Sequence, residues 1–232
     1  MSFDLVCPHC GAPSGPSVGV CPFCKTVLSE LTEKENRTLT AIKKLYQEGS
    51  VEDALAMITT LVLDKKQLEK NVNFLLLSAK LLMEAEGPTS KIRNQLTRAL
   101  LVDPDHKDVN EYLEVIEAKA LLKEGLNDYG EQGLKAILRR SPDNVHALFY
   151  LGTHLYWIEH QEASAIRYLE RCVQVRPNFL RAWGCLGSIY DEIGEITLAS
   201  RAFRKCIELE KNERMRAFFK QRLNETLGNI SS

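Results

Sequence analysis

Four cysteines near the N-terminus have the spacing of a metal site. Two residues separate Cys7 from Cys10, two separate Cys21 from Cys24, and ten lie between the pairs. Two intervening residues allow both thiolates of a pair to face one ion from a tight turn. Two such turns complete a tetrahedral site that leaves no position for water. The spacing therefore predicts one structural metal ion, bound by Cys7, Cys10, Cys21 and Cys24.

The paired cysteines resemble a minimal zinc ribbon, in a predicted N-terminal module of residues 1–29. The ten-residue spacer is shorter than the roughly 15–20 residues of longer zinc sites, as a trimmed ribbon would be. The resemblance implies one structural Zn²⁺, while iron stays open because rubredoxin-like sites use similar turns. So short a segment cannot build a large core, so metal binding would supply its stability.

A redox role for the first pair is the other alternative. Cys7-Pro8-His9-Cys10 resembles the active pair of a thioredoxin-like oxidase. That chemistry needs a strand before the motif, and the residues that precede Cys7 leave no room for one. It would also leave the second pair unexplained, so the metal site is the preferred interpretation.

The remaining cysteines and the N-terminus indicate a reducing compartment. Cys172, Cys185 and Cys206 lie among apolar residues in helical sequence, where cysteine behaves as a small hydrophobe. The N-terminus lacks the pattern of a signal peptide, and no apolar run approaches the ~20 residues needed to span a bilayer. We expect a cytoplasmic protein with no membrane segment.

The charge balance argues against nucleic acid. The chain has 30 Lys+Arg and 31 Asp+Glu, for a net charge of -1. Within residues 1–30 the single basic side chain is Lys25, opposed by Asp4 and Glu30. Because phosphate binding needs several cations, a ribbon that contacts RNA or DNA is the alternative hypothesis and not the leading one.

The sequence offers little support for catalysis. Phosphate-binding glycine loops, HExxH and the kinase set are all absent, and the one GxSxG spacing, Gly15-Pro16-Ser17-Val18-Gly19, falls between the two cysteine pairs. His154 and His160 lie six residues apart, which does not place both on one helix face. We expect no enzymatic activity.

From residue 30 onward the pattern is helical. Apolar residues recur at intervals of three and four, interrupted every 12–20 residues by Gly, Pro or capping residues. The pattern predicts an all-α array of antiparallel helix hairpins. The helices are expected near residues 31–48, 51–64, 68–86, 89–102, 106–124, 128–140, 144–158, 162–175, 179–193, 196–210 and 212–227.

A repeat is visible in the second half of the chain. Trp183-x2-Leu186-Gly187-x2-Tyr190 aligns with Leu148-x2-Leu151-Gly152-x2-Leu155, and the Leu-Gly pairs lie 35 residues apart. This pattern resembles the tetratricopeptide repeat, most strongly over 145–211 within a predicted repeat region of 30–211. The resemblance implies a right-handed superhelical array.

The residue types of the repeat follow from packing. Gly152 and Gly187 are expected to let paired helices approach closely, with Ala165 and Ala199 as the small residues opposite. Trp183, Tyr190 and Phe203 are expected to fill the space between hairpins. Residues 212–232 are predicted to be a C-terminal capping helix and tail. The predicted buried stripe of that helix is Met215, Phe218, Phe219 and Leu223.

The resemblance also implies a concave groove lined by the first helices of successive hairpins. Its predicted partner-binding residues are His146, Phe149, Thr153, Tyr156, Arg181 and Ser188. Aromatic and arginine side chains often dominate binding energy, so the hypothesis is that this groove holds a peptide of a partner protein. The alternative is that the aromatic residues pack against the preceding hairpin.

Together these patterns favour a non-enzymatic adaptor or scaffold that binds a protein partner on the repeat groove, with the zinc ribbon as a second contact module. A nucleic-acid-associated factor is the alternative. A third hypothesis is a metal-responsive regulator in which the four N-terminal cysteines act as a switch.

Overall fold

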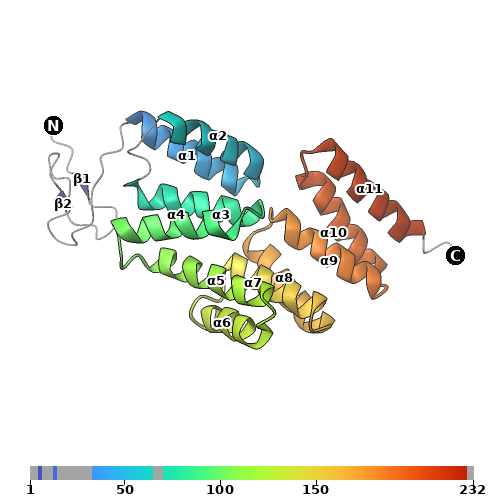
Figure 1. The fold of residues 1–232 in the computed structure, drawn as a ribbon. Helices are drawn as coiled ribbons and strands as arrows, with labels where there is room; N and C mark the ends of the chain where they lie inside the picture. The colour runs from blue at the N-terminus through green and yellow to red at the C-terminus, as the bar shows by residue number, and fades with distance from the viewer. Residues whose placement is uncertain (1–4, 7–12, 15–32, 65–69, 229–232) are drawn as a thin grey trace. The chain divides into compact units, whose positions relative to one another are not determined.

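The computed structural model describes residues 5–6, 13–14, 33–64 and 70–228, with side chains from residue 36 onward where the placement allows. Within these residues it contains two short strands and eleven helices (Figure 1). The chain divides into two compact units, Met1–Leu113 and Glu114–Ser232. The predicted all-α class and antiparallel helix hairpins are confirmed.

The first unit begins with a two-stranded ladder. β1 (Leu5–Val6) pairs antiparallel with β2 (Pro13–Ser14), so that Leu5 lies opposite Ser14 and Val6 opposite Pro13. The four predicted metal ligands, Cys7, Cys10, Cys21 and Cys24, lie outside the described residues.

Two helix hairpins follow in the first unit. They are formed by α1 (Glu33–Gln47), α2 (Val51–Asp64), α3 (Val72–Glu84) and α4 (Thr89–Val102). Their core contains the fully buried Ile42, Ala54 and Leu81. Helix α3 begins later than the predicted residue 68, because the side chain of Asn71 caps it by accepting a hydrogen bond from the amide of Phe74 (3.0 Å).

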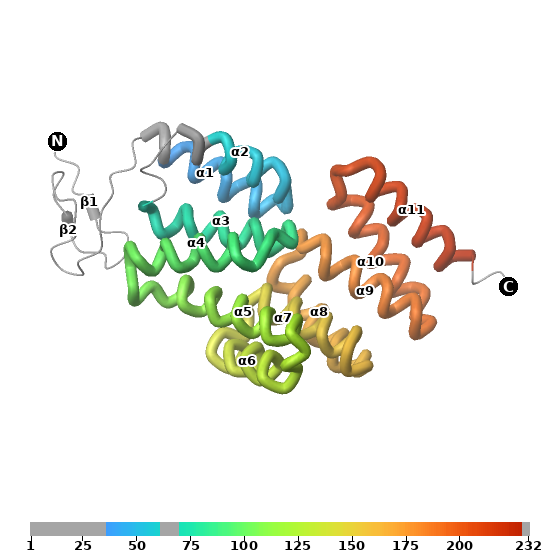
Figure 2. The backbone as a smooth tube through the Cα atoms, in the orientation of Figure 1, coloured from blue at the N-terminus to red at the C-terminus, as the bar shows by residue number. Residues whose placement is uncertain are grey.

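The second unit is also built of helices (Figure 2). Its helices are α5 (Lys107–Lys123), α6 (Asn127–Arg140), α7 (Val145–Trp157), α8 (Glu162–Val175), α9 (Leu180–Glu192), α10 (Ile196–Leu209) and α11 (Glu213–Gly228). The division between the units falls within α5. Helix α7 packs on α8, and α9 on α10.

The predicted glycine contacts are confirmed within these hairpins. A Cβ at Gly152 would lie 2.8 Å from the side chain of Leu169, and one at Gly187 would lie 2.7 Å from Phe203. Ala165 and Ala199 are fully buried, as expected. Phe203 lies against Gly187 within its own hairpin, and the guanidinium of Arg222 on α11 lies 5.6 Å from its ring centroid.

Five turns within hairpins share one backbone feature. In each of them a residue with positive φ lies just after the first helix. Glycine occupies this position in three turns, at Gly49, Gly125 and Gly194. Glu86 (φ 54°) and His160 (φ 52°) occupy it in the other two. The left-handed region carries a steric cost for any residue with a Cβ, so these two turns are strained.

Replacing the exposed His160 with glycine should relieve that strain. We expect His160→Gly to raise the free energy of unfolding by about 0.5–1 kcal/mol in urea denaturation. Gln161→Gly is the matched control, because Gln161 has an ordinary φ of -107°. Glycine at position 161 relieves no strain and only raises the conformational entropy of the unfolded chain. It should therefore lower the free energy of unfolding by a similar amount. Equal effects of the two changes would contradict this account of the turn.

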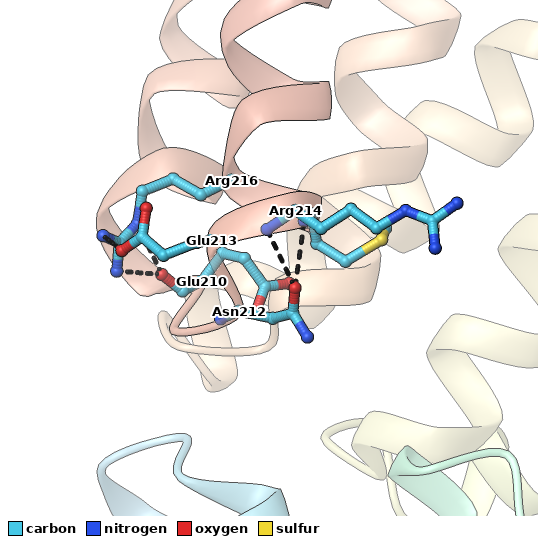
Figure 3. A network of polar contacts seen from close by, with 6 residues as sticks. Glu210, Asn212, Glu213, Arg214 and Arg216 are labelled. Carbon is cyan, nitrogen blue, oxygen red and sulfur yellow. Dashed lines mark hydrogen bonds and ion pairs between the residues drawn. The ribbon is translucent and has the colours of Figure 1, made fainter.

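The last helix, α11, begins in a local polar network (Figure 3). The Asn212 side chain accepts hydrogen bonds from the amides of Arg214 (3.0 Å) and Met215 (3.2 Å). Arg216 donates from Nε (2.9 Å) and Nη2 (2.7 Å) to the carbonyl of Glu210. The Asn212 bonds cap two amides of the first turn of α11, and the Arg216 bonds tie that turn to the C-cap residue of α10.

The predicted buried stripe of α11 was partly wrong. Phe219 is buried, but Met215 and Phe218 are 43% and 49% exposed. The buried side is rotated toward Thr226, which is fully buried. The cause lies in the contacts of α11 with the preceding hairpin, where Phe219 lies over Gly184 and the guanidinium of Arg222 bonds Asp191.

Candidate binding pocket between helices α6 and α8

The predicted groove is not exposed as a whole. His146, Phe149 and Tyr156 on α7 have exposed fractions of 0%, 3% and 6%. Thr153, and Arg181 and Ser188 on α9, are half-buried. The aromatic part of the predicted site is therefore core.

Contacts with the next hairpin account for this burial. The ring of Phe149 lies 5.1 Å from that of Phe179, centroid to centroid, and the guanidinium of Arg181 lies 4.5 Å above it. The hydroxyl of Tyr156 donates to a carboxylate oxygen of Glu192. The packing alternative thus describes these aromatics, although their partners belong to the following hairpin and not to the preceding one.

A pocket lies instead on the side of the unit formed by second helices. It has a volume of about 530 Å³. Helix α6 contributes three of its residues, α8 contributes three, and the remaining two come from the α6–α7 turn and from α7. They are Lys135, Leu138, Arg139, Pro142, Leu148, Arg167, Tyr168 and Arg171.

The local sequence places the basic residues toward one another. Lys135 and Arg139 are four residues apart on α6, and Arg167 and Arg171 are four apart on α8, so each pair lies on one helix face. Leu148, which is buried, provides an apolar wall.

Two of the four cations are already neutralised. Lys135 forms an ion pair with Glu131, and Arg171 contacts Asp143 through Nε (2.9 Å) and Nη2 (2.5 Å).

The other two cations are available to a ligand. Within the described residues Arg139 has no ion pair, and Arg167 has only a long hydrogen bond from Nη2 to Ser164 Oγ (3.5 Å). Both side chains are exposed. The carboxylates of Glu131 and Asp143 offset two of the four positive charges, so two remain uncompensated in the pocket. Guanidinium groups bind carboxylates through paired hydrogen bonds, so the arrangement can bind an acidic group beside an apolar one.

This pocket was missed in the sequence, although a signal was present. Basic residues at i and i+4 occur on the second helices of two consecutive hairpins. The predicted binding residues lie on the first helices of the hairpins instead, because the family resemblance implies a ligand there.

None of the described cysteines forms a disulfide. Cys172 and Cys206 are fully buried, as expected for small core hydrophobes, while Cys185 is half-buried. Burial raises the pKa of the Cys206 thiol, so this group stays protonated and unreactive. None of the described helices combines the length and the hydropathy that crossing a bilayer requires.

Comparisons with known proteins support a repeat assignment in this unit. Residues 180–213, which contain α9 and α10, match a tetratricopeptide repeat model. Over 116 residues, 50% of this chain, the sequence is 29% identical to a UDP-N-acetylglucosamine–peptide N-acetylglucosaminyltransferase of Giardia intestinalis. This chain spans 8% of that protein's length.

Two kinds of solved structure are similar to the chain. A crystal structure of MamA is 19% identical, with coverage of 75% of this chain and 96% of that one and a TM-score of 0.42. The C-terminal part of a TPR repeat-containing protein from Cytophaga hutchinsonii is 18% identical. It has coverage of 84% and 73% and a TM-score of 0.43.

Proposed function

We propose that this chain is a non-enzymatic protein-interaction scaffold whose pocket between α6 and α8 binds an acidic segment of a partner protein. Tetratricopeptide repeats generally mediate protein–protein contacts, and residues 180–213 match that repeat. The single observation that carries the finer proposal is the pair of exposed arginines, Arg139 and Arg167, without an ion-pair partner among the described residues. We place the protein in the cytoplasm, which the lack of a disulfide among the described cysteines supports.

The lining of the pocket defines the chemistry of the segment. Arg139 and Arg167 each suit one carboxylate, and Tyr168 on α8 adds a hydroxyl to the lining. Leu138, Pro142 and Leu148 offer contact area to one apolar side chain. An acidic segment that carries one leucine or similar residue therefore fits better than a uniformly charged one.

Protein is favoured over nucleic acid as the ligand. A nucleic-acid backbone needs a continuous track of cations, because each phosphate contact releases a counterion. Here Glu131 and Asp143 already pair with Lys135 and Arg171, so only two cations of the pocket are left for phosphates. A pocket of about 530 Å³ holds a few side chains and does not form a track.

A defined peptide tests this proposal. The probe is a fluorescein-labelled peptide in which Asp and Glu residues surround one Leu. The control peptide has Asn in place of each Asp and Gln in place of each Glu. Fluorescence anisotropy should show that the full chain binds the acidic probe, more weakly as salt is added, and does not bind the amide probe. Equal binding of both probes, or stronger binding of single-stranded RNA than of the acidic peptide, would refute it.

The predicted zinc ribbon is a second contact module in this proposal. The donor set, four cysteines in two CxxC pairs, suits a structural Zn²⁺. The antiparallel pairing of Val6 with Pro13 supports it, because this pairing joins the two residues that flank the segment with Cys7 and Cys10. The metal would supply folding energy there, and these cysteines would hold it as thiolates.

The zinc content of the purified chain should follow the N-terminal cysteines. We expect one tightly held zinc per chain by mass spectrometry under native conditions, and its loss on Cys10→Ser. Cys185→Ser is the matched control, since Cys185 is a half-buried cysteine of α9 that forms no disulfide. Bound iron, or a zinc content that Cys10→Ser leaves unchanged, would contradict the zinc assignment.

A further inference from the structure

Three metal-ligating side chains meet beside the α7–α8 turn in the second unit. Glu131 comes from α6, His154 from the last turn of α7, and Glu159 from the turn itself. One ligand atom of each lies within 4.8 Å of those of the other two. Nothing in the tetratricopeptide repeat or in the N-terminal cysteines accounts for this cluster.

Backbone hydrogen bonding keeps His154 and Glu159 close to each other. The amide of Glu159 donates to the carbonyl of His154 (3.4 Å), so the chain turns back beside the imidazole. The strained His160 follows directly, and it completes the turn that keeps Glu159 in this position.

The imidazole points to a missing ligand. The His154 side chain is 4% exposed, and its Nε2 is buried without a hydrogen-bond partner among the described residues. Such an atom calls for a partner, since buried polar groups in folded proteins nearly always have one. Oε1 of Glu159 lies 3.4 Å from this nitrogen, beyond a normal hydrogen bond.

That separation is the one found between two ligands of a single metal ion. Ligand distances of about 2.0–2.2 Å in tetrahedral geometry put two donors about 3.3–3.5 Å apart. One imidazole nitrogen and two carboxylates suit zinc, whereas magnesium and calcium prefer oxygen ligands alone. We propose that Glu131, His154 and Glu159 form a second divalent metal site, selective for Zn²⁺ over Mg²⁺ and Ca²⁺, with its remaining position open.

Lys135 is the competitor of the metal ion. Its ammonium forms an ion pair with Glu131 and neutralises one of the two carboxylates. Metal binding must release Lys135 from Glu131. The release would add a third available cation, beside Arg139 and Arg167, to the pocket between α6 and α8, since Lys135 also lines that pocket.

Zinc titration of the full chain tests the site. The chain is first loaded with one equivalent of zinc, so that the N-terminal cysteines are occupied, and is then titrated by isothermal calorimetry. We expect a further equivalent to bind the wild type, and at least about tenfold weaker binding in Glu131→Gln and in Glu159→Gln. Glu162→Gln, an exposed acid at the start of α8 outside the cluster, is the matched control and should bind as the wild type does.

Two further measurements complete the test: a variant that should bind zinc more tightly, and an NMR signal of His154. Lys135→Met removes the competitor and should strengthen zinc binding severalfold. The nitrogen NMR signal of His154 Nε2 should shift on zinc addition and not on Mg²⁺ addition. The proposal is overturned if no bound equivalent of zinc is weakened by Glu131→Gln and Glu159→Gln together, or if the His154 signal does not move. If the N-terminal cysteines bind no zinc, the first equivalent itself should be lost in the Glu→Gln variants.

Discussion

Alanine at Gly130 should destabilise the second unit by about 2 kcal/mol relative to alanine at Gly184. A Cβ at Gly130 would lie 2.5 Å from Leu122 Cδ2 and 2.8 Å from the carbonyl oxygen of Ala118. The leucine side chain can rotate, but the carbonyl belongs to the backbone of α5. Helices α5 and α6 must therefore separate, and overpacking of this kind costs about 1–3 kcal/mol.

Gly184→Ala isolates that steric effect. Gly184 is also helical, but a Cβ there would meet Phe219 at 3.7 Å, an ordinary contact. Both changes gain about 1 kcal/mol of helix propensity, so their difference reports the clash. Urea denaturation with an unchanged m-value measures it. Equal stabilities of the two variants would show that close approach at Gly130 does not hold this hairpin together.

Charge reversal in the pocket should abolish most binding of the acidic peptide. The double change Arg139→Glu and Arg167→Glu removes the two uncompensated guanidinium groups and puts carboxylates in their place. We expect affinity to fall at least about thirtyfold, which is about 2 kcal/mol. Fold stability should change little, because both side chains are exposed and neither makes an ion pair among the described residues.

The double change Arg204→Glu and Lys220→Glu is the control for net charge. Both residues are exposed, on α10 and α11, and neither lines the pocket. This variant carries the same total charge as the pocket variant, so long-range repulsion of the peptide should be similar. If the two variants lose affinity equally, the peptide responds to overall charge and the pocket is not its site.

The hairpin array could be predicted because its local signals agree. Helices α2, α4 and α8 have the bounds that the sequence predicts, since each is delimited by capping or helix-breaking residues such as Asp103-Pro104 and Arg176-Pro177. Gly152 and Gly187 were recognised as points of close approach from their repeat positions alone, and the packing confirms both.

The candidate site could not be predicted in the same way, because it depends on contacts between hairpins. Phe149 and Tyr156 have the spacing of an exposed strip, and only the approach of Phe179 and Glu192 buries them. The cluster around His154 was missed for a related reason. Sequence spacing relates His154 only to nearby residues such as His160, whereas Glu131 lies on the preceding hairpin.

Amide NMR mapping of the acidic peptide on the full chain is the most direct measurement of the central claim. The account predicts that the largest shift changes fall on α6 and α8, around Leu138, Arg139, Arg167 and Tyr168, and that Arg139→Glu with Arg167→Glu removes them. Shift changes concentrated on α7 and α9, around Thr153, Arg181 and Ser188, would contradict it and would return the binding site to the groove of the first helices.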